Sequence, residues 1–264
     1  LFNSRDKKSL MLALPEFKQA YIQEKKTSFG LEALTNFINA AVDLHAMQSP
    51  AEDILDDSSS YLNTANELYD EAKYFFGYNE RLVSAIIRVY KQQANLNKIL
   101  SGYKTLFEHG NLNLNTLSSW IFFNNYKKSW SQKDYFKYTK LLQTYVEKFP
   151  ENKLVKIKEK KGEKIKIGFL SGDILKKHSI TYFLKTVLLN YDKDRFEIFL
   201  YLDNKIEDDN TNEIKALVKK TRNISNLNNI DATNLIRQDE IDIIFDIMGL
   251  TSVKRIALFK NRLA

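Results

Sequence analysis

Residues 164–182 read KIKIGFLSGDILKKHSITY, and this stretch decides how the second half of the chain folds. It opens with an apolar run at 165–170, passes through a turn of small residues, and becomes helical in pattern after His178. A strand, a polar turn and a helix in this order form the first βα unit of an α/β domain. Such domains bind ligands at the carboxyl ends of their strands, so we expect Asp173 and His178 to lie at that edge.

The chain continues to alternate between strand and helix patterns after this unit. FEIFLYL at 196–202 and IDIIFDI at 241–247 predict two further strands, and the second is almost continuously apolar, as buried parallel strands are. A short strand is expected at 223–227, and helical patterns cover 179–190, 211–220 and 231–237. The sequence therefore predicts a Rossmann-like lobe with a parallel sheet at 164–264.

Residues 1–150 have a helical pattern throughout, with apolar residues repeating at intervals of three and four positions. No period of about 34 residues keeps its signature positions, so the pattern leaves open whether these helices form tetratricopeptide-like repeats or a bundle. Residues 151–163, ENKLVKIKEKKGE, predict a charged linker between this helical domain and the α/β lobe.

Composition excludes several classes of protein. Among 264 residues there is no cysteine and there are only three histidines, so we expect no disulfide and no metal site, and we place the protein in the cytoplasm, a reducing compartment. No apolar run approaches the ~18 residues that a membrane span needs. The net charge is +7, but the lysines are spread over the whole chain, which favours a solvated surface over nucleic-acid binding.

Common catalytic motifs are also missing. The chain has no G-x-G-x-x-G after a strand, so Asp203 lacks the glycines that would make it a ribose-binding acid, and it has neither a P-loop nor a G-x-S-x-G elbow. His178 fits a general base or a ligand for a phosphate or hydroxyl, and equally a surface histidine beside two lysines. Gly249 would allow a ligand close to the backbone and Thr251 offers a hydroxyl, although an ordinary turn explains both.

Four segments, taken together and in order, resemble the catalytic region of glycosyltransferase family 41, the O-GlcNAc transferase and SPINDLY family. They are KIKIGFLSGDILKKHSITYFL at 164–184, YDKDRFEIFLYL at 191–202, QDEIDIIFDIMGLT at 238–251 and RIALFKNRLA at 255–264. Residues 117–141 resemble the helical hairpin that precedes the catalytic domain in bacterial members, so the resemblance covers about 115–264. The chain departs from the pattern at Thr139, where bacterial members often carry a histidine, and at Leu263, where the family has proline.

The resemblance implies a helical N-terminal domain followed by the first Rossmann-like lobe of a two-lobed GT-B enzyme. Such enzymes transfer GlcNAc or a related sugar, with inversion and without a metal, from a nucleotide sugar such as UDP-GlcNAc to serine or threonine of proteins. The resemblance gives His178 the catalytic position. The predicted acceptor and sugar cleft contains Ser171, Asp173, Gly249 and Thr251.

The resemblance also implies two partners. The helical domain would present the protein acceptor, and the nucleotide sugar would bind mainly to a second lobe that these residues do not contain. We therefore expect the sequence to be part of a longer enzyme and to be inactive by itself. The alternative is a helical interaction module whose α/β domain is not catalytic.

Overall fold

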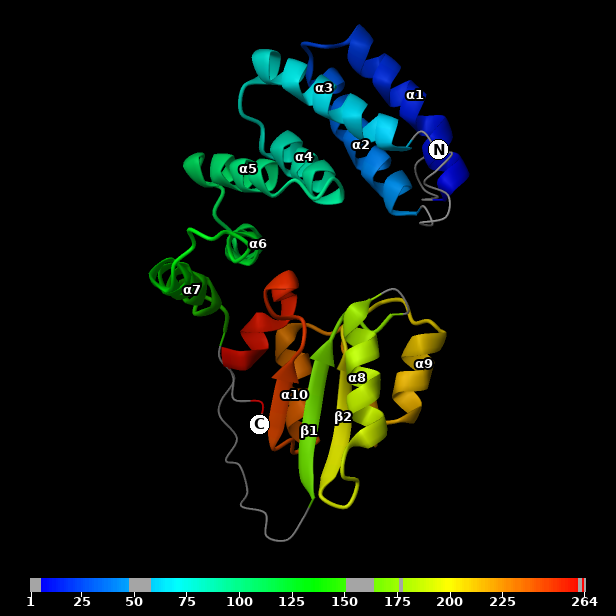
Figure 1. The fold of residues 1–264 in the computed structure, drawn as a ribbon, viewed down its shortest axis with the longest axis vertical. Coiled ribbons are helices and arrows are strands. Elements are labelled where there is room, and N and C mark those ends of the chain that lie inside the picture. Colours follow the sequence, from blue (N-terminus) through cyan, green and yellow to red (C-terminus); the bar gives the residue numbers. More distant parts are fainter. Residues whose placement is uncertain (1–5, 48–57, 151–163, 176–177, 261–262, 264) are drawn as a thin grey trace. The chain divides into compact units, whose positions relative to one another are not determined.

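The computed structural model describes residues 6–47, 58–150, 164–175, 178–260 and 263 (Figure 1). The linker predicted at 151–163 lies outside the described residues, as do Lys176 and Lys177. The chain divides into two compact units, Leu1–Thr116 with Phe123–Lys127, and Leu117–Phe122 with Lys128–Ala264. The division passes through α6 (Leu114–Asn124), and the domain boundary proposed near residue 150 stays a prediction.

The first unit is helical. Within it α2 is the central helix, because it packs against three neighbours and buries residues around most of its circumference. Asparagine, aspartate or threonine side chains accept hydrogen bonds from first-turn amides of α1, α2, α4 and α5, which is the preferred way to start a helix. The bounds are α1 (Lys7–Gln23), α2 (Ser28–Ala46), α3 (Ser58–Phe76), α4 (Glu80–Gln92) and α5 (Leu96–Glu108).

The second unit contains a four-stranded parallel sheet in the order β3-β2-β1-β4. It is preceded by α7 (Gln132–Val146), which begins with a capping box between Ser131 and Asp134. The structure confirms the predicted combination of a helical N-terminal region and a parallel α/β lobe. None of the described helices combines the length and the apolar composition that crossing a membrane requires. The strands are β1 (Ile165–Ser171), β2 (Phe196–Leu202), β3 (Lys220–Asn223) and β4 (Ile243–Asp246).

The helix and strand predicted between residues 211 and 227 are displaced in the structure. The helix α9 is Asp209–Ala216 and the strand β3 is Lys220–Asn223, where a helix to 220 and a strand at 223–227 were predicted. Asp208 and Thr211 form a reciprocal capping box, so the helix begins earlier and Thr211 lies in its first turn. The chain then returns early enough for Lys220 to pair with Phe199 of β2.

Helices cover both faces of the sheet (Figure 1). On one face, α8 (Ser179–Asn190) and α9 pack against alternate side chains of β2. On the other face, α10 (Asn229–Gln238) and the 3-10 helix η2 (Val253–Lys260) pack against the remaining side chains of β2, which point the opposite way. This alternation follows from the two-residue period of a strand, and it gives the lobe two hydrophobic cores. The β2 side chains are Ile198, Leu200 and Leu202 on the first face, and Phe199 and Tyr201 on the second.

A buried carboxylate ties this second face together. The side chain of Asp239, only 1% exposed, accepts hydrogen bonds from Lys220 Nζ (2.7 Å), Arg222 Nη2 (2.8 Å) and the Tyr201 hydroxyl (3.1 Å). Burial raises the pKa of the Asp239 carboxyl, but the hydrogen bonds from Arg222, Lys220 and Tyr201 outweigh it and hold that pKa below its usual value. The charged form is therefore favoured in the folded protein, and it links β2, β3 and the end of α10.

Replacing this carboxylate should destabilise the lobe in a pH-dependent way. Since the pKa of Asp239 is lowered on folding, its contribution is complete above the unfolded value of about 3.9 and is lost as pH falls through the folded value. We expect Asp239→Asn to lower the free energy of unfolding by about 3 kcal/mol at pH 7. The difference from the wild type should shrink below about pH 4.

Urea unfolding followed by circular dichroism at pH 7 and pH 3 measures this difference. Asp194→Asn, in the exposed turn before β2, is the matched control and should be close to neutral. If Asp239→Asn loses the same stability at both pH values, the charged form of Asp239 does not stabilise the lobe as proposed.

Candidate functional site

The carboxyl ends of β1, β2 and β4 lie side by side, since β1 pairs with β2 on one side and with β4 on the other. Backbone hydrogen bonds extend this pairing just beyond the strands. Asp203 N donates to Ser171 O at 2.8 Å, and Ile247 N donates to Leu170 O at 3.1 Å. The loops that follow the three strands therefore start at one edge, which is where the sequence predicts the site.

The last residue of β1 is the buried Ser171, whose Oγ accepts a hydrogen bond from Asp173 N at 3.0 Å. The next residue, Gly172, donates its N–H to Met248 Sδ at 3.0 Å. A Cβ atom at Gly172 would lie 3.4 Å from that sulfur, an ordinary contact distance, so the backbone hydrogen bond is what joins the β1 and β4 loops. Ser171 thus shapes the loop from below, while Asp173 is half-buried within it.

Thr181, which the sequence analysis did not single out, fixes the same loop onto α8. Its buried hydroxyl lies 2.8 Å from Leu175 O and 3.3 Å from Asp173 O. A threonine in the first turn of a helix that follows a polar loop is the signal that could have identified it.

His178 is exposed and is the N-cap residue of α8. Its Nδ1 accepts a hydrogen bond from Ile180 N at 3.4 Å. The neutral tautomer that makes this bond carries its proton on Nε2. His178 therefore presents an Nε2–H donor to the solvent at the edge of the sheet.

The loop after β4 is a turn held by its own polar groups. Asp246 Oδ1 accepts hydrogen bonds from Met248 N (2.9 Å) and Gly249 N (3.3 Å). Gly249 has φ +55°, a left-handed conformation in which a side chain would be strained. Thr251 Oγ1 donates to Met248 O at 2.6 Å, so its proton is engaged and its oxygen can only accept from a ligand.

This turn, η1 (Gly249–Thr251), is also fixed from α6. The buried Ser118 hydroxyl donates to Leu250 O at 2.5 Å. Both residues belong to the second compact unit. The helical segment at 117–122 is therefore part of the support of the candidate site.

A buried ion pair stabilises the edge at β2. Arg255 on η2 is 2% exposed, and its Nη2 and Nε donate to Asp203 Oδ1 at 2.7 and 2.9 Å. The remaining donors reach Leu227 O, Ile224 O and Asn229 Oδ1, so all three guanidinium nitrogens are used. Because its carboxylate is engaged here, Asp203 is a structural residue, in agreement with the missing glycine fingerprint for a ribose-binding acid.

Comparisons with known proteins agree with this geometry. The model of glycosyl transferase family 41 matches residues 138–264. That part of the chain belongs to glycosyltransferase family 41. The fold of the whole chain is similar to that of a mutant O-GlcNAc transferase from Thermobaculum terrenum, with a TM-score of 0.63 and 15% sequence identity. The similarity covers 97% of this chain and 49% of that one, so the chain spans about half the length of the matched transferase. No curated protein sequence matches the chain.

Within the family 41 region, the predicted site residues lie at the carboxyl ends of two adjacent strands. Ser171 is the last residue of β1, Asp173 and His178 follow it, and Gly249 and Thr251 follow β4. The described residues contain no group of three or more histidine, aspartate or glutamate side chains that could hold a metal ion. The exposed donor and acceptor groups at this edge are suited to binding the oxygens of a sugar or an acceptor hydroxyl.

The buried ion pair between Arg255 and Asp203 should contribute to the stability of the family 41 region. Arg255→Lys should lower the free energy of unfolding by about 3 kcal/mol, because lysine cannot replace the guanidinium's five donors and leaves Asp203 poorly compensated. Lys254→Gln is the matched control, since Lys254 also contacts Asp203 at 2.9 Å but is half exposed and should contribute less than about 1 kcal/mol. Chemical denaturation measures both, and equal effects would contradict the assigned role of Arg255.

Proposed function

We propose that this chain contributes the acceptor-side wall of the cleft in an inverting protein O-glycosyltransferase. The enzyme would transfer GlcNAc or a related sugar from a nucleotide sugar, UDP-GlcNAc first among the candidates, to serine or threonine hydroxyls of proteins in the cytoplasm. The observation that carries the proposal is the family 41 region at 138–264 with an exposed histidine donor at the carboxyl edge of its sheet.

In an inverting transfer, the acceptor hydroxyl oxygen forms a bond to the anomeric carbon, the nucleotide diphosphate leaves with the electron pair of the broken bond, and the hydroxyl proton passes to the departing diphosphate. The Nε2–H of His178 is suited to donating a hydrogen bond to an oxygen on which charge develops during this step. To accept the proton instead, the ring would have to change tautomer and lose its bond to Ile180 N. We therefore assign His178 a catalytic role as a hydrogen-bond donor.

The other four residues would form the wall around it. Ser171 and Asp173 set the path of the β1 loop, Gly249 holds the turn that lets a ligand approach the backbone, and Thr251 offers its oxygen as an acceptor. No metal enters this proposal, and the developing charge is met by hydrogen-bond donors alone.

The remaining parts of the reaction are assigned to the rest of the protein. Because the chain spans about half of the matched transferase, we propose that most nucleotide contacts lie outside these 264 residues and that they are inactive alone. The helical domain would present the protein acceptor.

Two substitutions at one position separate the chemistry from the fold. Asparagine is a preferred N-cap, so His178→Asn should keep α8 stable while removing the Nε2 donor. We expect it to lower kcat about 100-fold in the full-length protein. His178→Ala should lower kcat similarly and also cost about 1 kcal/mol of stability through the lost cap.

Transfer is measured with labelled UDP-GlcNAc and GDP-fucose onto protein acceptors, and stability is measured by thermal unfolding. Unchanged transfer by His178→Asn would remove His178 from the mechanism. A wild-type protein that transfers neither sugar would instead favour the interaction-module alternative.

A further inference from the structure

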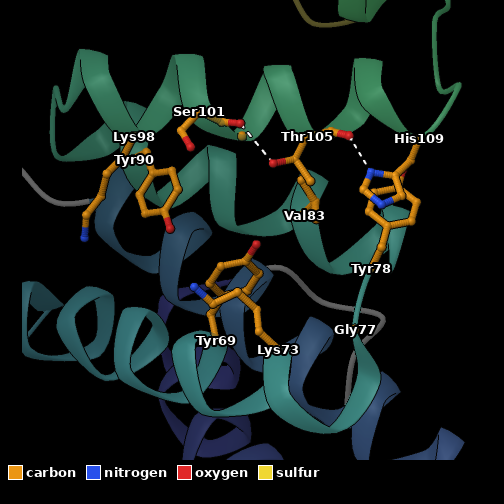
Figure 2. Close-up of a pocket in the computed structure, with 11 residues that line it drawn as sticks. Tyr69, Lys73, Gly77, Tyr78, Val83, Tyr90, Lys98, Ser101, Thr105 and His109 are labelled. Atoms are coloured by element: carbon orange, nitrogen blue, oxygen red, sulfur yellow. Dashed lines mark hydrogen bonds between the residues drawn. The ribbon is translucent and has the colours of Figure 1, made fainter.

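A pocket of about 350 Å³ lies entirely within the first compact unit, between α3, α4 and α5 (Figure 2). Its volume is in the range of small ligand sites. Its lining combines aromatic rings with hydrogen-bond donors, notably Tyr69 and Lys73 from α3, Tyr90 from α4, and Lys98 from α5. The proposed transferase site does not involve any of these residues.

Three tyrosines line this pocket, and among the described residues none of their hydroxyls has a hydrogen-bond partner; only the hydroxyl of Tyr78 is enclosed. Tyr69 and Tyr90 are each 8% exposed, and their hydroxyls point toward one another across the pocket (Figure 2). These two oxygens are open to the pocket rather than enclosed, so both hydroxyls are available to donate hydrogen bonds to a ligand that supplies an acceptor.

The environment keeps both hydroxyls protonated. Burial raises the pKa of Tyr69, an effect that the Lys73 ammonium opposes and the Asp70 carboxylate reinforces. Burial is also the largest cause of the raised pKa of Tyr90, with smaller contributions from Tyr69 and Asp70. Both side chains are therefore hydrogen-bond donors at neutral pH.

The two lysines that line the pocket differ in their pairing. Lys73 lies 5.1 Å from the centre of the Tyr69 ring but is paired with Asp70 at 2.7 Å. Lys98 lies 5.3 Å from the centre of the Tyr90 ring and has no carboxylate within 4 Å in the described part of the chain. A singly charged anion would pair with the Lys98 ammonium.

The aromatic residues that line the pocket also favour an amino-acid side chain over a free anion. His109 stacks on Tyr78 with ring centres 3.8 Å apart, and it bonds Thr105 O through Nδ1 at 2.9 Å. The aromatic walls suit the aliphatic part of a side chain, and the donors suit its polar end.

We propose that this pocket binds the carboxylate of an aspartate or glutamate side chain in a protein segment held by the helical domain. The carboxylate would accept hydrogen bonds from the hydroxyls of Tyr69 and Tyr90 and pair with the ammonium of Lys98. The inference rests on the proposed function in one respect, because it names what the helical domain would recognise in an acceptor protein.

Binding is tested without sugar transfer. A fluorescein-labelled Gly-Ser peptide with one central glutamate is titrated by anisotropy, beside the same peptide with glutamine. The glutamate peptide should bind tighter. Lys98→Gln should weaken its binding about tenfold, and Tyr90→Phe about threefold, through the lost charged and neutral hydrogen bonds respectively. Lys104→Gln is the control on the same helix, where Lys104 pairs with Glu108, and should bind like the wild type.

Three results would each overturn the proposal. The two peptides could bind equally, or the Lys98→Gln variant could bind the glutamate peptide as tightly as the wild type does. Inorganic phosphate could also displace the glutamate peptide at concentrations where acetate has no effect. A transfer assay separates it from the proposed function. If the full-length protein transfers sugar but Lys98→Gln leaves KM unchanged for acceptors with and without a nearby acidic residue, the pocket's role fails alone. If the peptide binds as predicted but no transfer occurs, the proposed function fails and the carboxylate site stands.

Discussion

The buried ion pair between Asp203 and Arg255 is the contact on which the candidate site depends. One guanidinium joins the end of β2, the connection between β3 and α10, and the helix η2 that follows the β4 loop. A charge at this depth is tolerated only when its donors are satisfied, and every nitrogen of Arg255 has a partner. Because β1 lies between β2 and β4, the ion pair at the end of β2 is next to the strand that leads to His178.

The local sequence was sufficient to predict the bounds of a helix or strand where its pattern was unambiguous. The strand β2 and the helix α8 have the predicted bounds, because an apolar run of β-branched and aromatic residues or a clear helical pattern lies between polar turns. The predicted bounds of α9 and β3 were wrong for two reasons. The capping box of Asp208 with Thr211 starts the helix earlier than predicted, and the polar strand KTRN lacks the apolar pattern by which a strand is recognised. Its place in the sheet comes from pairing with β2, which the local sequence does not reveal.

The location of the candidate site followed from topology, but its hydrogen bonding did not. Strand ends in a parallel sheet share an edge, so the order of the motifs was enough to predict the loops of His178 and Gly249. The sequence could not show that Nδ1 of His178 caps α8, or that Thr251 donates to Met248 O. It also did not reveal Ser118, which lies 132 positions from Leu250 in the chain and supports the same turn.

The central claim is that the carboxyl edge of the family 41 lobe is the acceptor side of a glycosyltransferase cleft. Photo-crosslinking tests it most directly. The full-length protein is irradiated with UDP-GlcNAc and an acceptor peptide that carries a photoreactive group beside its serine, and the adducts are mapped by mass spectrometry. The account predicts adducts at residues 171–181 or 246–251 that depend on the nucleotide sugar. Adducts found only elsewhere in the chain would contradict it.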